Sequence, residues 1–266
     1  MTMPELPEVE MKTRYLESTS LGMPVEKVSV RDPRVLDGVT PAGLARGLKS
    51  TRLSCARRRA KYILAGTDSG DTLLLHFGMT GDLYFRSRGM RKPGYSRVEF
   101  TFEGGGCLHF IDTRLFGKVA FYRTTDEREI PLIARLGPEP LGRSFRCGDF
   151  ERIVRGHRTT IHQLLMDQEL IAGIGNIYSD EITYQAGVLP YRRTDTLTDE
   201  EVRALYDKIK WVLRRAVELN AELDGRADVF LIPNRVKGGL CPRTREPLIR
   251  KTIGGRTSYY CPTCQR

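Results

Sequence analysis

The sequence predicts an α+β protein with a strand-rich first half, a helical second half and a C-terminal hairpin. Between about residues 25 and 125, apolar residues alternate with polar ones, and glycines separate the short runs. Beyond about residue 150, apolar residues recur every three or four positions, as on one face of a helix. With 266 residues, the chain is long enough for two compact domains.

The chain opens on a predicted helix whose first turn carries prolines and acids. Pro4 and Pro7 fit at or just before that turn, where no N–H donor is needed. The glutamates within residues 5–10 complement the positive end of the helix dipole. Gly22 provides a stop. Taken alone, this segment indicates a surface helix packed on a domain edge.

Short strands separated by glycine turns follow the first helix. Val98, Phe100 and Phe102 alternate with polar residues, the three glycines of 104–106 make a turn, and the alternation resumes at Leu108. Such a series is typical of a β-sandwich or a β-barrel, and the pattern does not choose between them.

A rigid connector separates the strands from the helices. Residues 136–142 contain two prolines and two glycines, which favours a domain boundary there. Further on, Thr198 and Glu201 have the spacing of a capping box. The apolar stripe behind them reaches about Asn220, and we interpret it as core packing.

The last segment, residues 226–266, is strongly basic. It holds nine Lys or Arg and two acids, so its net charge is +7. Residues 252–260 have the pattern of a β-hairpin with Gly254 and Gly255 at its turn. We therefore expect three domains, at residues 1–135, 136–225 and 226–266.

Composition restricts the class of partner. The formal net charge is +10, which suits a polyanion such as nucleic acid, although a merely soluble basic protein would have the same surplus. The start of the chain lacks the pattern of a signal peptide, and no stretch approaches the ~18–20 apolar residues of a membrane span. Three scattered cysteines fit a reducing compartment. We therefore expect a cytoplasmic protein without membrane association.

Seven stretches stand out in order along nearly the whole chain: PELPEVE at 4–10, RRAKY at 58–62, HFGMTG at 76–81, DTRLFG at 112–117, LGPEPL at 136–141, GIGNIY at 173–178 and RTSYYC at 256–261. Together they resemble the formamidopyrimidine-DNA glycosylase family, which includes the endonuclease VIII type enzymes. The resemblance implies an N-terminal catalytic β-sandwich with an appended helix, a helix–two-turn–helix DNA-binding domain and a zinc-finger-like β-hairpin. It also implies a DNA repair glycosylase and abasic-site lyase, without an organic cofactor, that acts on double-stranded DNA containing oxidised bases or abasic sites. We expect a monomer.

The resemblance makes Pro4 the nucleophile, through its amine. An α-amino group, with a pKa of about 8, is substantially neutral at neutral pH, whereas a Lys amine at about 10.4 is mostly protonated. A neutral secondary amine can displace the base at the sugar C1′ and collapse to an iminium ion, which promotes β,δ-elimination of the phosphates. Glu5 is then the general acid that protonates the opening sugar ring.

Pro4 has a free amine only if the three residues before it are removed. We expect translation to start at Met3 and methionine removal to expose Pro4. If the extra residues stay, the alternative is a non-catalytic binder of damaged or abasic DNA. A second alternative is a general nucleic-acid-binding protein, whose lesion-independent affinity would fall steeply with salt.

The resemblance also assigns DNA contacts in the strand-rich region. Lys61 matches an essential lysine that binds the phosphate beside the lesion, and His76 resembles a further phosphate contact. Met79, Arg114 and Phe116 match a trio that fills the gap left by an everted base. Four of these residues also have a structural interpretation: a solvated strand end for the lysine, a satisfied structural residue for the histidine, and core packing for Met79 and Phe116.

Further contacts follow in the second half. Asn176, with adjacent backbone N–H groups, matches a phosphate-binding turn, and Arg256 matches a hairpin arginine that clamps phosphates. Glu181 matches a family carboxylate near the active site. The segment 221–240 looks too short for the loop that caps 8-oxoguanine in some members, so the preferred lesion stays open.

The C-terminal cysteines keep the spacing of the family's zinc finger but lack one ligand. Cys241, Cys261 and Cys264 match three positions of a C-x2-C, sixteen-residue, C-x2-C pattern, and Thr244 stands at the fourth. Structural zinc takes four ligands, usually thiolate or imidazole. The three cysteines could bind zinc with water or Glu246, or the hairpin could fold without metal.

Overall fold

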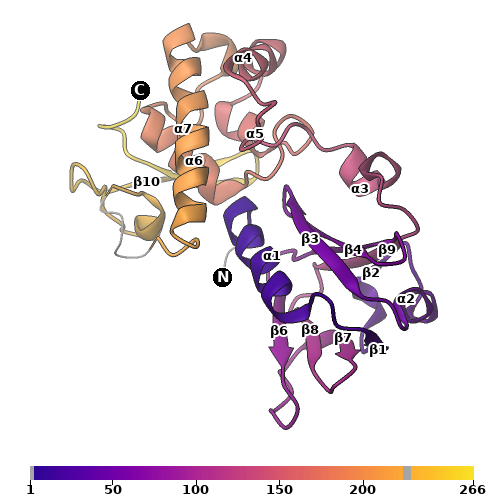
Figure 1. The fold of residues 1–266 in the computed structure, drawn as a ribbon. Coiled ribbons are helices and arrows are strands. Elements are labelled where there is room, and N and C mark those ends of the chain that lie inside the picture. Colours follow the sequence, from indigo (N-terminus) through magenta and orange to yellow (C-terminus); the bar gives the residue numbers. More distant parts are fainter. Residues whose placement is uncertain (1–2, 224–228) are drawn as a thin grey trace. The chain divides into compact units, whose positions relative to one another are not determined.

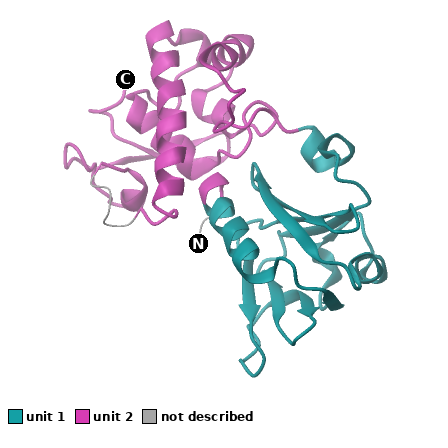
Figure 2. Ribbon diagram, viewed as in Figure 1, with its two compact units in different colours: residues 1–4, 8–135 teal, residues 5–7, 136–266 magenta. Residues whose placement is uncertain are grey.

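The computed structural model describes residues 3–223 and 229–266, which form two compact units. The first unit contains residues 1–4 and 8–135, and the second contains residues 5–7 and 136–266 (Figure 2). The segment 226–266, expected as a third domain, belongs to the second unit. The expected boundary at 225/226 lies outside the described residues.

The first unit is built on two separate sheets, which decides for a sandwich over a barrel (Figure 1). One sheet has the strand order β1-β7-β8-β6, with all its pairs antiparallel. The other has the order β2-β9-β5-β4-β3, with only β2 and β9 parallel. The strands are β1 Val25–Val30, β2 Leu36–Asp37, β3 Leu53–Arg59, β4 Tyr62–Thr67, β5 Thr72–His76, β6 Asp82–Arg86, β7 Ser96–Phe102, β8 Cys107–Ile111 and β9 Lys118–Tyr122.

Helices close the core of this unit. Helix α1 (Leu6–Ser20) contributes Val9 and Leu16, and α2 (Pro41–Leu48) contributes Leu44 and Leu48 to the same buried cluster. The predicted alternation is confirmed: the residues of β7 and β8 that belong to this buried cluster, Val98, Phe100, Phe102, Leu108 and Phe110, are every second residue of each strand. The shorter helices of the unit are η1 Pro33–Val35, η2 Glu127–Glu129 and α3 Pro131–Ala134.

The second unit is helical and carries the hairpin. The capping box of Thr198 and Glu201 is present, and it opens α7 (Asp199–Glu218). The apolar stripe of α7 packs into the unit's core, as expected from the sequence. The other elements of the unit are α4 Cys147–Gly156, α5 Ile161–Met166, α6 Asn176–Ala186, η3 Thr194–Thr196, η4 Ile232–Asn234, β10 Ile249–Ile253 and β11 Arg256–Tyr260.

The hairpin β10–β11 is present where the sequence predicts it. The strands pair antiparallel, from Ile249 opposite Tyr260 to Ile253 opposite Arg256. Both turn glycines, Gly254 and Gly255, have positive φ, which side chains other than glycine seldom adopt. Within the described ranges, no helix has both the length and the apolar character needed to cross a membrane.

Candidate active site and nucleic-acid interface

The Glu5 side chain is docked on the first turn of α6, within the second unit. Its carboxylate accepts hydrogen bonds from the N–H groups of Gly175 (2.6 Å), Ile177 (2.8 Å) and Tyr178 (3.2 Å). These are groups that a helix leaves unsatisfied at its start, and the helix dipole favours a negative charge there. Glu5 is only 1% exposed. The carboxylate therefore anchors the residue that follows Pro4.

Two glycines make room for this docking. A Cβ on Gly175 would come within 2.5 Å of the Glu5 Cδ, and a Cβ on Gly173 within 2.9 Å of the Leu6 side chain. The Leu6 N–H also donates to the Gly173 carbonyl at 3.0 Å. Gly173 has φ +95°, which adds a conformational reason for glycine. The lack of a side chain at Gly173 and Gly175 thus lets Glu5 and Leu6 pack against the turn that precedes α6.

This docking changes the expectation for the turn before α6. Sequence reasoning expected the N–H groups adjacent to Asn176 to hold phosphates, but those of Gly175, Ile177 and Tyr178 already bond to Glu5. The Asn176 side chain donates instead to the Thr257 carbonyl on β11 at 2.8 Å. Its Oδ1 is buried without a hydrogen-bond partner among the described residues.

Lys61 lies in the tight turn between β3 and β4, in the first unit. Ala60, just before it, has φ +54°, a left-handed conformation that is rare for alanine. Arg58 donates to the Ala60 carbonyl at 3.1 Å and pairs with Glu10 on α1 at 3.1 Å. Lys61 is only 6% exposed, so it is not a solvated strand end.

His76, at the end of β5, is held as a neutral imidazole. Burial, followed by the charges of Lys61 and Lys118, lowers the pKa of His76 to about 4. The Gly78 N–H donates to its Nδ1 at 3.3 Å, which leaves the proton on Nε2. The ring contacts Tyr62, with 4.8 Å between ring centroids. His76 can therefore offer an anion an N–H donor but not a positive charge.

Two loops of the first unit are tied together by a buried carboxylate, Asp112. Its Oδ1 accepts from the Thr80 hydroxyl (2.5 Å) and the Arg114 N–H (3.1 Å), and its Oδ2 accepts from the Gly117 N–H (2.7 Å). Asp112 is fully buried. Sequence reasoning quoted this residue within DTRLFG but assigned it no role. The available signal was its place directly after β8.

The tie joins the segments that carry Met79, Arg114 and Phe116. Gly78 fits only as glycine, because a Cβ would collide with the backbone of Phe116. The Arg114 guanidinium lies over the Phe116 ring, 4.9 Å from its centroid. Phe116 is 51% exposed, which excludes core packing for it, while Met79 is partly buried. An exposed cation stacked on an exposed ring suits contact with nucleic-acid bases.

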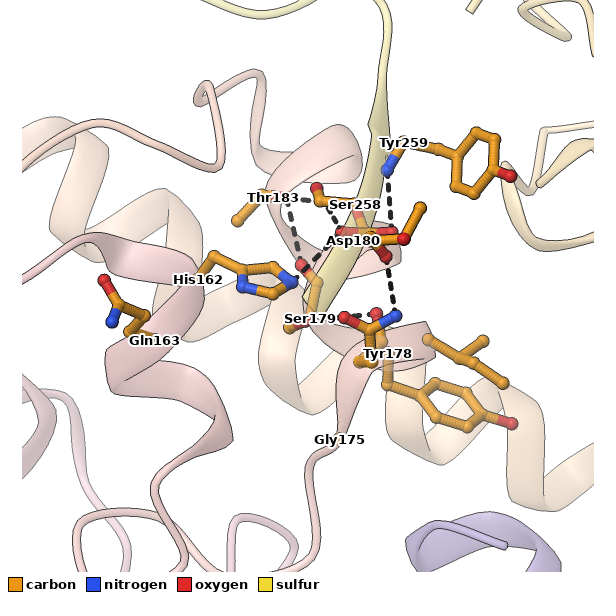
Figure 3. A network of polar contacts seen from close by, with 12 residues as sticks. His162, Gln163, Gly175, Tyr178, Ser179, Asp180, Thr183, Ser258 and Tyr259 are labelled. Carbon is orange, nitrogen blue, oxygen red and sulfur yellow. Dashed lines mark hydrogen bonds and ion pairs between the residues drawn. The ribbon is translucent and has the colours of Figure 1, made fainter. Parts of the chain in front are cut away.

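A second buried carboxylate, Asp180 on α6, organises the hairpin side of the second unit. Its Oδ1 accepts from the Ser258 hydroxyl at 2.6 Å, and its Oδ2 accepts from the Tyr259 N–H at 2.9 Å (Figure 3). Arg235 donates to Oδ2 through Nε (2.9 Å) and through a terminal nitrogen (2.6 Å). His162 Nε2 lies 3.4 Å from Oδ1. Sequence reasoning missed Asp180 and Arg235, because nothing in the sequence marks a charged side chain as buried.

The side chain of Glu181, the next residue, contacts η4 and Gln185 and not the hairpin. Its carboxylate accepts from the Ile232 N–H (2.9 Å) and the Gln185 side chain (2.8 Å). Burial raises the pKa of Glu181 to about 7. It thus holds η4 against α6, and this role was not expected from the sequence.

The three C-terminal cysteines come together in the second unit. Their sulfur atoms all lie within 4.8 Å of one another, and those of Cys241 and Cys264 are 3.6 Å apart. Thiolates around a zinc ion with bonds of ~2.3 Å are about 3.8 Å apart, so the group could hold a metal ion. The Thr244 hydroxyl lies 3.6 Å from the Cys261 sulfur and 3.4 Å from a Glu246 oxygen.

The predicted site residues divide between the two units. Lys61, His76, Met79, Arg114 and Phe116 belong to the first unit, and so does Pro4. The second unit holds the remaining predicted residues, namely Glu5, Asn176, Arg256 and the three cysteines. Of the three residues before Pro4, Met1 and Thr2 lie outside the described residues. So does part of the segment 221–240 that sequence reasoning judged too short for a capping loop.

Comparison with known proteins gives a consistent match along the chain. A model of the formamidopyrimidine-DNA glycosylase N-terminal domain matches residues 3–119, and a model of the formamidopyrimidine-DNA glycosylase H2TH domain matches residues 136–225. Formamidopyrimidine-DNA glycosylase of Thermus thermophilus is 38% identical over 275 residues, covering 99% of this chain and 98% of the relative. That of Desulfitobacterium hafniense is 33% identical over 273 residues, covering 99% and 100%.

Solved structures agree with the sequence relatives. The MutM (Fpg) protein of Thermus thermophilus matches with a TM-score of 0.84 and 36% identity, covering 98% of each chain. Lactococcus lactis formamidopyrimidine-DNA glycosylase, non-covalently bound to DNA containing an AP site, matches with a TM-score of 0.89 and 26% identity over 98% and 99% of the chains. This chain therefore belongs to the formamidopyrimidine-DNA glycosylase family and is a DNA repair glycosylase.

Proposed function

We propose that this protein excises oxidised or ring-opened bases from double-stranded DNA and then cleaves the strand, through a Schiff base on Pro4. The observation that carries the proposal is the docking of Glu5 on α6, which fixes the residue bonded to Pro4. Lactococcus lactis relatives with 25–26% identity are complexes with DNA containing an abasic site or FAPY-dG. These supply the substrate class.

The chemistry begins with the unprotonated amine of Pro4, freed of residues 1–3. Its lone pair attacks the sugar C1′, and the bond to the damaged base breaks with the electron pair leaving on the base. Ring opening then gives an iminium ion between Pro4 and C1′. The cation acidifies the C2′ hydrogen, so that loss of this proton expels the 3′ phosphate, and a second elimination releases the 5′ phosphate.

Glu5 is suited to move one proton in this sequence. Three N–H donors favour the ionised carboxylate in the resting protein. In our proposal, the carboxylate first takes the proton that the Pro4 nitrogen loses after attack, and then delivers it to the ring oxygen as the ring opens. Glu5 thus serves as the general acid without being protonated at the start.

We assign the remaining residues to DNA binding. Lys61 supplies a buried positive charge and His76 a neutral N–H donor for the phosphate beside the lesion. Met79, Arg114 and Phe116 enter the gap left by the everted base, whose extrusion costs a few kcal/mol. Asn176 and Arg256 are assigned to lesion-flanking phosphates.

We also propose that Cys241, Cys261 and Cys264 hold a zinc ion that stabilises the hairpin. The fourth ligand would be an oxygen, from Glu246 or from water beside Thr244, in place of the usual sulfur or nitrogen. Cobalt substitution reads the ligand set directly: a three-thiolate site gives visible absorption that strengthens in T244C. Absence of stoichiometric metal from chelator-free protein, together with an unchanged melting temperature in C261S, would refute this assignment.

Borohydride reduction in the presence of abasic duplex tests the catalytic proposal. A covalent adduct at Pro4, mapped by peptide mass spectrometry, is the expected result, together with an intact-mass measurement showing that Pro4 is the first residue. P4G retains a free amine after processing and is expected to trap weakly, whereas protein retaining residues 1–3 traps nothing. If correctly processed protein yields neither an adduct nor strand cleavage, the non-catalytic binder of damaged DNA is the better description.

A further inference from the structure

Helix α6 contacts both the N-terminal segment and the hairpin that carries Arg256. Its first turn holds Glu5, and one turn further along the helix it holds β11. Asn176 and Asp180 are four residues apart and so share a face of the helix. Asn176 bonds to the Thr257 carbonyl, and Asp180 to Ser258 and Tyr259. Each strand residue from 257 to 259 is thus bonded to this face.

We propose that Asp180 is a positioning residue that acts through Arg256, by fixing β11 on α6 so that the guanidinium meets a DNA phosphate. This inference rests on the proposed function. Arg256 is the first residue of β11, directly ahead of the three residues bonded to α6. The backbone of Arg256 is therefore fixed by its neighbours, while its own side chain is exposed.

The turn of the hairpin, at Gly254 and Gly255, is also held in place by a contact with α5. A Cβ on Gly254 would come within 2.7 Å of the Gln163 side chain, so the turn packs directly on α5. Arg256 and Arg158 line a surface cavity of about 570 Å³ at this place, together with Thr159. Asp167 also lines the cavity, and two guanidinium groups against one carboxylate still favour an anion such as a phosphate. Arg256 thus lies between two fixed points, the turn on α5 and the strand on α6.

Asp180 is suited to this role because its buried charge is compensated. Arg235 is 8% exposed and Asp180 is fully buried, so the ion pair is shielded from water. Arg235 also donates to the Asn176 carbonyl at 3.4 Å and lies over the Tyr259 ring. Both Asp180 oxygens accept from the hairpin, Oδ1 from Ser258 and Oδ2 from Tyr259. Because both carboxylate oxygens are fully hydrogen-bonded, Asp180 fixes the hairpin in a single position on α6.

The test compares S258A and D180N with R256A. S258A removes one bond between α6 and the hairpin and leaves the Asp180–Arg235 pair in place, so it remains informative if D180N folds poorly. T183V is the matched control, because the buried Thr183 hydroxyl donates, among the described residues, only to the Ser179 and Asp180 carbonyls within α6. Each variant is combined with R256A. The probe is a duplex with a tetrahydrofuran abasic analogue, and binding is measured by fluorescence anisotropy over a range of salt concentrations.

We expect S258A and D180N to weaken binding about tenfold and to reduce the salt slope by about 0.9, as the loss of one phosphate contact does in R256A. In the R256A background they should cause no further loss, and T183V should leave the slope unchanged. Losses that add to that of R256A, or an unchanged slope, would overturn the inference. If the unmodified protein does not prefer the abasic duplex over an undamaged one, the proposed function fails instead.

Discussion

Asp112 and Asp180 solve a similar problem in different ways. Both are fully buried aspartates that tie segments of the chain together from within. Asp112 binds hydroxyl and backbone N–H groups of two neighbouring loops in the sandwich. Asp180 on α6 accepts from the hairpin residue Ser258 and also from the Arg235 guanidinium, so one of its partners is charged. Two neighbouring loops are thus ordered by neutral donors alone, whereas the joint between α6 and the hairpin places a compensated charge in the core.

The largest expected effect is from D180A. It leaves the Arg235 guanidinium buried without its carboxylate, and breaking a buried pair on one side typically costs about 3–5 kcal/mol. We expect the free energy of unfolding to fall by about that amount in urea denaturation. The double variant D180A/R235M, which removes both charges, should recover most of it. A loss below about 1 kcal/mol in D180A would show that the pair is not needed.

The next effect concerns D112N. The amide retains one acceptor oxygen but places an NH₂ group against N–H donors, so that at least one buried donor loses its partner. We expect a loss of about 2–3 kcal/mol in the free energy of unfolding, and base excision should be impaired while trapping on a preformed abasic site is affected less. Equal loss of both activities would contradict a role confined to the gap-filling loops.

A third prediction concerns pH and His76. The folded pKa of about 4 lies below the ordinary value of 6.5, so the unfolded chain binds more protons between these values. Stability from this residue is therefore complete above about pH 6.5 and is lost as pH falls toward 4, by about 3 kcal/mol. H76N, which keeps an acceptor for the Gly78 N–H, should flatten the stability profile in that window. An identical profile in both proteins would contradict the assignment.

The smallest effect on stability is expected for F116A. The ring is half exposed, so its removal should change the free energy of unfolding by no more than about 0.5 kcal/mol. Binding of a lesion-containing duplex should weaken about tenfold, while binding of an undamaged duplex stays the same. Equal weakening on both duplexes would indicate a general contact in place of gap filling.

Sequence reasoning predicted the elements well because their patterns are local. The capping box at Thr198, the strand alternation around Phe100 and the glycine turn at Gly254 each follow from neighbours in the chain. It also selected three cysteines that the structure brings together. Propensity and periodicity act over a few residues, so these features required no knowledge of the fold.

The parts that could not be predicted depend on contacts across long separations. Glu5 meets Gly175 across 170 residues, and Asp180 meets Ser258 across 78. The expectation that N–H groups beside Asn176 are open to phosphate was wrong for three of them, since the sequence does not show that Glu5 fills this place. Asp112 and Asp180 look like ordinary polar residues until burial is known.

The absence of a side chain at Gly175 offers a handle for engineering. A single added methyl group would displace the Glu5 carboxylate from the start of α6 while leaving the sandwich and the loops that carry Met79 and Phe116 untouched. With Glu5 in its proposed role, alanine at this position yields a protein that binds damaged duplexes yet turns them over slowly, a useful reagent for mapping lesions.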